Sequence, residues 1–429
     1  MALVTESHRV DGHDVHEHRL EVPLDRTGRV PGTVSLFARE YVRDGGADRP
    51  HLLYLQGGPG HGADRPEQVG GWLDRALEDH RVVLLDQRGT GASTPLDAQA
   101  LTAAGDAAAQ ADVLALHRAD AIVDDAEELR EHLTGGAPWT VLGQSYGGFV
   151  ITCYLSRAPR GLREAYVFAG LPGLRASADD VYRATYRQTA VRNAEFFARY
   201  PRDRATAAAV ARHLDDVEEL LPTGERLSGR RFRTLGIALG GQSRFDALHF
   251  ALEDPFTTVR GQRRLRGAFL ARVGAQLSFA QHPMYAALHE SIYAQGALTG
   301  ATAWSAHRVR GEFAEFSLDA PGFAFTGEHV YPWQFAEDPA LVPLAGAVDV
   351  LAHRDDLPAL YDPDVLAENR VPVAAAVYVD DMFVPYELSR ATAAAVRGAR
   401  TFVTNEYQHD GIRRDGRRIY DVLQGLLRR

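Results

Sequence analysis

A serine flanked by glycines is the first feature of the sequence whose residue types and spacing suit catalysis. Residues 143–148 read GQSYGG, which fits the pattern Gly-x-Ser-x-Gly around Ser145. The pentapeptide follows an apolar run, WTVL, and precedes a helical pattern, GGFVITCYL. A serine on such a sharp strand-to-helix turn projects its hydroxyl from the sheet edge, where flanking side chains would clash. The pattern predicts that Ser145 is a nucleophile for acyl transfer, with a structural turn as the alternative.

The same three letters recur at residues 241–243, where they predict something else. Ser243 is followed by Arg244 and Phe245, so the second glycine of the motif is missing. No strand pattern precedes it, and the helical pattern RFDALHFALED follows it. A serine in that position is typical of a helix N-cap. We therefore expect Ser243 to cap a helix and not to act as a nucleophile.

A glycine cluster follows another apolar run earlier in the chain. Residues 56–60 read QGGPG and come directly after the strand pattern HLLYL. Glycines there free backbone N–H groups to point at a substrate oxygen, as an oxyanion hole requires. We expect the amide of Gly58 to be one donor and the amide of Tyr146, next to Ser145, to be the other. A plain tight turn is the alternative, whereas phosphate binding is excluded because the Gly-x-Gly-x-x-Gly and Walker patterns are absent here.

Two acids and a histidine near the C-terminus are candidates to complete the catalytic set. A serine nucleophile needs a base, and the base needs an acid that orients it. On this kind of turn the three residues follow in chain order serine, acid, histidine. The strand pattern AAAVYV is followed by Asp380 and Asp381, of which Asp381 is favoured. The last strand pattern is followed by His409 in TFVTNEYQHDG, which predicts His409 as the base.

Other histidines are weaker candidates. His61 directly follows the glycine loop and could line a pocket without being the base. The close cluster of His13, His16 and His18 could be read as a metal site, but a solvated turn and strand face is the preferred interpretation. The predicted acyl transfer requires neither a metal nor an organic cofactor.

The elements that must position these residues alternate in a regular way. Apolar runs of five or six residues alternate with helical patterns, which indicates the α/β class with a mostly parallel sheet covered by helices on both faces. An antiparallel pair opens the chain at 18–24 and 34–42. The further predicted strands are 51–55, 81–86, 139–143, 163–170, 371–379 and 400–405, and the predicted helices include 118–134 and 386–397.

The middle of the chain has a different character. From about residue 172 to 350 helical patterns dominate, as in SADDVYRATYRQTAVRNAEFFARY, and such a block cannot easily supply parallel strands. The simplest account is one sheet domain, formed by residues 1–171 and 351–429, that is interrupted by a helical cap over 172–350.

Composition and charge exclude several classes of protein. The 429 residues, 45% of them hydrophobic, allow a large core and exceed a typical single domain. A net charge of −10 argues against nucleic-acid partners and anionic membrane surfaces. No apolar run is long enough to span a membrane, and the N-terminus lacks the pattern of a signal peptide. Cys153 is the single cysteine, so we expect a packed thiol without a disulfide and a cytoplasmic protein. A homo-oligomer is compatible with the sequence but not indicated by it.

The chain resembles the α/β-hydrolase proline iminopeptidases (prolyl aminopeptidases), particularly the larger type with a long helical cap. The resemblance rests on LQGGPG, LLDQRGTGAST, VLGQSYGGF, VYVDDMFVP and NEYQHDG, and extends to the cap stretches YAALHESIYAQG and FTGEHVYPWQF. It assigns the oxyanion hole to Gly58 and Tyr146, the acid to Asp381 and the base to His409. Gln56 is a departure, because smaller relatives commonly have histidine there, and this bears on the subfamily more than on catalysis.

The resemblance implies a serine exopeptidase that releases N-terminal proline from short peptides through an acyl-enzyme. The terminal ammonium of such a substrate needs an acidic anchor, and the resemblance places such acids in the cap. Glu290 is the first candidate, and Glu253 and Glu328 are weaker ones; the alternative for each is a solvated or salt-bridged helix face. Two other functions stay open, an esterase or amidase on the same scaffold and a non-enzymatic binding protein.

Overall fold

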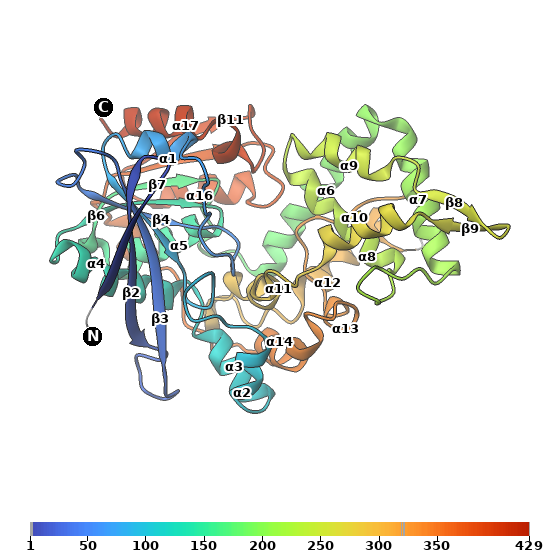
Figure 1. Ribbon diagram of the computed structural model, residues 1–429, viewed down its shortest axis with the longest axis horizontal. Coiled ribbons are helices and arrows are strands. Elements are labelled where there is room, and N and C mark those ends of the chain that lie inside the picture. Colours follow the sequence, from blue (N-terminus) through green and yellow to red (C-terminus); the bar gives the residue numbers. More distant parts are fainter. Residues whose placement is uncertain (1–2, 319, 321, 429) are drawn as a thin grey trace.

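A mostly parallel sheet forms the centre of the computed structural model, which describes residues 3–318, 320 and 322–428 (Figure 1). Within these residues, nine strands form one sheet in the order β1-β2-β3-β5-β4-β6-β7-β10-β11. The strands from β5 to β11 in this order are parallel, and β1, β2 and β3 extend the sheet in antiparallel fashion. Their bounds are β1 (Val4–Val10), β2 (His13–Pro23), β3 (Thr33–Val42), β4 (His51–Leu55), β5 (Arg81–Asp86), β6 (Trp139–Gln144), β7 (Leu162–Phe168), β10 (Val373–Tyr378) and β11 (Ala399–Thr404).

The parallel strands are short runs of buried apolar residues, as expected of strands that are covered on both faces. In β4 every residue except His51 is buried, and in β10 every residue is. The sequence prediction is confirmed for all six parallel strands within two residues at their ends, and for the antiparallel pair of β2 and β3. The strand β1 was not predicted.

Helices cover both faces of the sheet (Figure 1). The helices α4 and α5 pack on one face and α1 and α17 on the other. In α4 the buried residues Ile122, Val123, Ala126 and Leu129 follow the helical period, and Gly135 ends the helix in the left-handed conformation with φ 63°. The helices of this part are α1 (Gly71–Ala76), α2 (Ala98–Ala103), α3 (Ala107–Ala115), α4 (Ala119–Thr134), α5 (Tyr146–Arg157), α15 (Pro363–Ala367), α16 (Tyr386–Ala395) and α17 (Gly411–Leu427).

Between β7 and β10 the chain forms the cap, the green to orange lobe beside the sheet in Figure 1. Its helices are α6 (Ala178–Arg199), α7 (Pro201–Asp216), α8 (Gly229–Arg233), α9 (Arg244–Leu252), α10 (Gly267–Leu277), α11 (Pro283–Leu288), α12 (Ser305–Arg310), α13 (Gln334–Glu337) and α14 (Ala345–Ala352). It also contains the short helix η2 (Thr234–Gly240) and an unpredicted hairpin of β8 (Phe256–Val259) and β9 (Gln262–Leu265).

The cap has an apolar core of its own, with Phe196, Phe232 and Phe325 at its centre. Its last helix, α14, packs against α3 of the sheet domain, so the cap is anchored on both sides of the cavity described below. The predicted α/β fold with a large helical insertion is confirmed, whereas the exact domain boundaries remain predictions. Over the described ranges, no helix combines the length and the apolar character that crossing a bilayer requires.

A buried polar network behind the sheet edge fixes the loop after β5. Arg88 and Asp125 form an ion pair at 2.6 Å, and each side chain is 1% exposed. The Arg88 guanidinium also donates to the carbonyl oxygens of Leu24 and Leu116. The neighbouring Gln87 donates from Nε2 to the carbonyl oxygen of Gln56 at 2.9 Å. The network therefore holds the glycine loop that begins at residue 56.

Replacing Arg88 by alanine should strongly destabilise the protein, because it leaves the Asp125 carboxylate buried without its main partner. We expect Arg88→Ala to lower the free energy of unfolding by about 3–5 kcal/mol, measured by urea denaturation. Arg26 is a matched control, since its Nη2 lies 3.3 Å from the same carboxylate but its side chain is 33% exposed. Arg26→Ala should cost less than about 1 kcal/mol, and equally small losses for both variants would contradict this account.

Candidate active site

Ser145 lies on a tight turn between β6 and α5, in a backbone conformation with φ 55° and ψ −124°. Such angles are strained for a residue with a side chain and are typical of a serine held for reaction. The turn is possible because two glycines leave room for it. A Cβ on Gly147 would stand 1.9 Å from the carbonyl oxygen of Leu55, and one on Gly143 would stand 2.4 Å from that of Gly147. The amide of Ser145 donates to the carbonyl of Phe168 at 2.9 Å, which ties the turn to β7.

His409 and Asp381 are brought together from the loops after β11 and β10. His409 Nδ1 lies 2.8 Å from Asp381 Oδ2, and the aspartate side chain is 1% exposed. The other carboxylate oxygen, Oδ1, accepts from the backbone N–H groups of Phe383 and Val384 at 2.8 and 3.0 Å. Asp381 is thereby held as an acceptor for the imidazole N–H, which leaves Nε2 with the free electron pair. Asp380 does not take this place.

The second ring nitrogen of His409 faces the turn that carries Ser145. The Gln144 side-chain amide donates to His409 Nε2 at 3.3 Å. Within the described chain, the Ser145 hydroxyl makes no hydrogen bond to the imidazole, although both groups line one cavity. Hydrogen bonds of a catalytic set are often long or poorly aligned before substrate binds.

The predicted oxyanion loop lies directly against Ser145. A Cβ on Gly57 would stand 3.0 Å from Ser145 Cβ, so the backbone of the loop approaches the serine as closely as atoms allow. Gly58 lines the same cavity. Tyr146 is the first residue of α5, so the Tyr146 backbone N–H has no acceptor within the helix. The carbonyl of Gln56 accepts from the Gln87 side-chain amide, which fixes the start of the loop, and Gln56 itself lines the cavity.

The cavity above Ser145 has a volume of about 300 Å³ and lies between the sheet domain and the cap. The sheet domain contributes Gln56, Gly57, Gly58, His61, Gln144, Ser145, Phe383, His409, Asp410, Ile412 and Arg413. The cap contributes Ile237, Gly240, Gly241, Arg244, Ser278, Phe279, His282, Tyr285 and Glu328. A space of this size, with aromatic walls and a few polar groups, suits a small ring and the adjoining end of a short chain.

Glu328 is the candidate anchor that lines this cavity. Its Oε1 accepts from the Tyr285 hydroxyl at 2.6 Å. Burial raises the pKa of Glu328 to about 7, although His409 and the Tyr285 hydroxyl oppose the shift. Burial lowers the pKa of His409, but the Asp381 and Glu328 carboxylates outweigh it, so the net shift is upward. The acid and the base therefore affect each other's charge.

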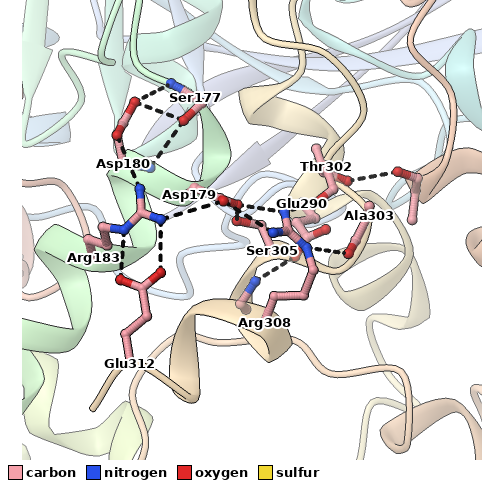
Figure 2. Close-up of polar contacts among 12 residues, drawn as sticks. Ser177, Asp179, Asp180, Arg183, Glu290, Thr302, Ala303, Ser305, Arg308 and Glu312 are labelled. Carbon is pink, nitrogen blue, oxygen red and sulfur yellow. Dashed lines mark hydrogen bonds and ion pairs between the residues drawn. The ribbon is translucent and has the colours of Figure 1, made fainter.

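Glu290 lies in the cap beside Thr302, Ser305 and Arg308 (Figure 2). Its Oε1 accepts from the backbone N–H of Ala306 at 3.0 Å, at the start of α12. Around it, Arg308 donates to Asp179 at 2.6 Å and Arg183 pairs with Glu312 at 2.8 Å, so α12 is held against the N-terminus of α6. Glu290 does not line the cavity above Ser145, although its carboxylate and that of Glu328 both raise the pKa of Tyr293. The third candidate, Glu253, is exposed at the end of α9.

Sequence reasoning missed several residues that line the cavity. Gln144 and Arg413 carried a usable signal, since one neighbours Ser145 and the other follows His409 by one helical turn. Phe279 and His282 carried none, because they come from a cap loop whose position depends on tertiary packing. His61 lines the cavity, as the sequence suggested, with its ring 4.1 Å from that of His282. Burial and His282 lower the pKa of His61 to about 4, so the ring is neutral.

Ser243 occupies the N-cap position of α9, but the predicted side-chain cap is wrong. Its backbone is already helical, with φ −70° and ψ −17°, so the hydroxyl does not reach the first free N–H groups. The hydroxyl instead donates to Asp410 Oδ2 at 3.4 Å.

Other residues that the sequence singled out have structural partners. Cys153 is buried in the core around α5, as predicted, and burial raises the pKa of its thiol. His18 Nε2 lies 3.2 Å from Glu40, and His16 Nδ1 lies 2.8 Å from the Ser7 hydroxyl. Nowhere in the described ranges do three histidine, cysteine or acidic side chains gather as metal ligands would.

Comparison with known proteins places this geometry in a family. Residues 50–255 match the family model of the alpha/beta hydrolase fold. A proline iminopeptidase of Aeromonas sobria is 45% identical over 425 residues, which cover 98% of this chain and 98% of the relative. A proline iminopeptidase of Aspergillus aculeatus is 34% identical over 421 residues, which cover 96% of this chain and 93% of the relative. The chain therefore belongs to the proline iminopeptidase family of α/β hydrolases.

Proposed function

We propose that the protein is a serine exopeptidase that releases N-terminal proline from short peptides. The observation that carries this proposal is the carboxylate of the half-buried Glu328, which lines the same cavity as Ser145 and His409 and forms no ion pair among the described residues. A desolvated carboxylate without a cationic partner is costly, and a terminal ammonium would relieve that cost. The names of the two full-length relatives support the same activity.

In the proposed mechanism, the proline ring occupies the aromatic part of the cavity with its ammonium at Glu328. His409 Nε2 takes the proton of the Ser145 hydroxyl, and Oγ attacks the first peptide carbonyl. This step requires the Gln144 amide to release Nε2, which a side-chain rotation achieves. The amides of Gly58 and Tyr146 stabilise the oxyanion.

The protonated His409 then donates its proton to the leaving amine, and the shortened peptide departs. A water molecule, deprotonated by His409, hydrolyses the prolyl ester on Ser145 and restores the hydroxyl. Asp381 keeps the imidazole in the correct tautomer throughout and stabilises its positive charge. The cytoplasm remains our prediction for the compartment, because the single cysteine is buried and unpaired.

A free terminal amine should be required for cleavage. We expect prolyl-β-naphthylamide to be hydrolysed and its N-acetylated form to be at least about a hundredfold slower in kcat/KM, because the acetyl group removes the charge that Glu328 binds. Comparable rates for the two compounds would indicate an amidase or esterase on the same scaffold.

Ser145→Ala should lower kcat by at least about four orders of magnitude, because it removes the proposed nucleophile from the turn beside the glycine loop. Ser243→Ala is the matched control, since this serine carries the same Gly-Gln-Ser letters but bonds to Asp410 outside the catalytic set. It should stay within about twofold of the parent in prolyl-β-naphthylamide hydrolysis. If Ser243→Ala were the inactive variant, the nucleophile would be misassigned.

Glu328→Gln should reduce kcat/KM for prolyl-β-naphthylamide by about a hundredfold and leave an amine-free ester, such as p-nitrophenyl acetate, much less affected. The acid limb of the ester's pH–rate profile should also move to lower pH in this variant. The reason is that catalysis needs neutral His409, whose pKa Glu328 raises, so loss of the carboxylate lowers the pH at which the base is protonated.

Two variants serve as comparisons. Glu253→Gln changes an exposed carboxylate and should leave kcat/KM unchanged for both the amine substrate and the ester. Glu290→Gln tests the rival anchor: it should lower the melting temperature, because its carboxylate accepts from α12, without selective loss on the amine substrate. If Glu290→Gln, and not Glu328→Gln, lowered kcat/KM selectively for the amine substrate, Glu290 would be the residue that binds the ammonium.

A further inference from the structure

Two arginines at the cavity mouth are not used by the mechanism above. Arg244 is the first residue of α9 in the cap, and Arg413 lies in the first turn of α17 in the sheet domain. Both line the cavity that contains Ser145, and both are exposed. In the part of the chain that the structure describes, neither guanidinium makes a hydrogen bond or an ion pair. Both side chains are therefore available to a ligand, in contrast to the buried Arg88, which is paired with Asp125.

The two guanidinium groups act at close range on each other and on the catalytic set. Desolvation and the charge of Arg413 both lower the pKa of Arg244. Arg413 also opposes the upward shift of the His409 pKa. Arg244 comes from the cap and Arg413 from the sheet domain, and both line the same cavity as His409.

The other charges around the cavity make its polarity uneven. Glu328 is half-buried whereas Arg244 and Arg413 are exposed, so the carboxylate lies on the more enclosed side of the cavity, and burial raises its pKa to about 7. Asp410 is the acid that accompanies the arginines, and its Oδ2 accepts from the Ser243 hydroxyl at 3.4 Å. Two guanidinium groups against one carboxylate leave the mouth positive, in a protein whose net charge is −10.

This polarity matches one class of substrate. The residue that an exopeptidase removes occupies the closed end of its cavity, so the rest of the peptide points to the mouth. A short peptide is a zwitterion, with its ammonium at the first residue and its carboxylate only a few residues away. Each residue spans at most about 3.6 Å, so only a short peptide can bring its carboxylate to the mouth while its ammonium is at Glu328.

We propose that Arg244 and Arg413 bind the C-terminal carboxylate of the substrate and make the enzyme selective for free-acid prolyl peptides of about two to four residues. The guanidinium group offers paired N–H donors that fit a carboxylate, and the charge strengthens both hydrogen bonds. The inference rests on the proposed function, because it assumes that the amine end of the peptide lies at Glu328. The proposed carboxylate site predicts a preference for short peptides with a free C-terminal carboxylate, which Ser145, His409 and Asp381 alone do not explain.

The test compares prolyl-oligoalanine peptides of two to eight residues, each as the free acid and as the C-terminal amide. We expect kcat/KM for the acid to exceed that for the amide by about tenfold at the best length, and the ratio to approach one for the longest peptides. The acid should differ from the amide mainly by a lower KM. This difference should decrease between about 0.02 and about 0.5 M NaCl, because salt screens the attraction between the arginines and the carboxylate. A ratio near one at every length would overturn the proposal.

Variants identify the groups responsible. Arg244→Gln and Arg413→Gln should each reduce the acid-to-amide ratio, and the double variant should bring it to about one. Arg414→Gln is the matched control, because this neighbouring side chain donates to Gln242 and does not line the cavity, and it should keep the parent ratio. If the double variant lowers kcat/KM equally for acids and amides, the arginines do not bind the C-terminal carboxylate.

Two further measurements separate the possible failures. Thermal unfolding of each variant shows whether the fold is kept, so that a ratio is compared only between folded proteins. Cleavage of prolyl-β-naphthylamide, which has no carboxylate, reports the proposed exopeptidase activity by itself. If the parent protein cleaves this compound and shows no acid preference, the carboxylate site is wrong and the proposed function stands; if it does not cleave it, the proposed function fails.

Discussion

The active site depends on one close contact between two pieces of backbone, the turn after β6 and the end of β4. At Gly147 there is no room for a side chain, because a Cβ would stand 1.9 Å from the Leu55 carbonyl oxygen. The parallel pairing of Leu55 with Gly143 brings these strand ends together. The same contact holds Ser145 in its strained conformation and sets Gly57 against it. The proposed nucleophile and the glycine loop of the proposed oxyanion hole are thus positioned by a single backbone arrangement, before any side-chain interaction is considered.

The electrostatics of the cavity follow from placing two carboxylates near one imidazole. The Asp381 carboxylate accepts hydrogen bonds from His409 and from two backbone N–H groups, so both of its oxygens have partners in the interior. Among the described residues, the Glu328 carboxylate accepts one hydrogen bond, from the Tyr285 hydroxyl, and burial raises its pKa to about 7. A substrate ammonium would favour the ionised form of Glu328, and that negative charge would in turn favour the imidazolium that forms during attack. Substrate binding and general-base catalysis are therefore coupled through one residue.

The sequence predicted the parallel strands and the catalytic loops because both are local signals. Runs such as HLLYL and VAAAVY are too apolar to lie on the surface, so they predict buried strands. Gly-x-Ser-x-Gly between a strand and a helix is typical of a tight turn that carries a nucleophilic serine. The strand β1 was missed because its residues are almost all exposed and alternate without an apolar face. The choice between Glu290 and Glu328 lay beyond the sequence for a different reason. Both sit in similar cap motifs, and only tertiary packing decides that one carboxylate faces the cavity and the other a helix end.

The cap contacts the two loops that carry the proposed base and its acid. The amide of His409 donates to the carbonyl of Gly240, a cap residue, at 3.2 Å. A Cβ on Gly240 would stand 2.1 Å from the ring of Phe383, whose own amide bonds to Asp381. A single position in the cap thus contacts both loops that carry the base and its acid. Lifting the cap would break these contacts and disturb the proposed base, so we expect substrate to enter while Gly240 stays against the loops that carry His409 and Asp381. Entry with the cap in place admits a peptide end more readily than the middle of a folded chain, which favours exopeptidase action.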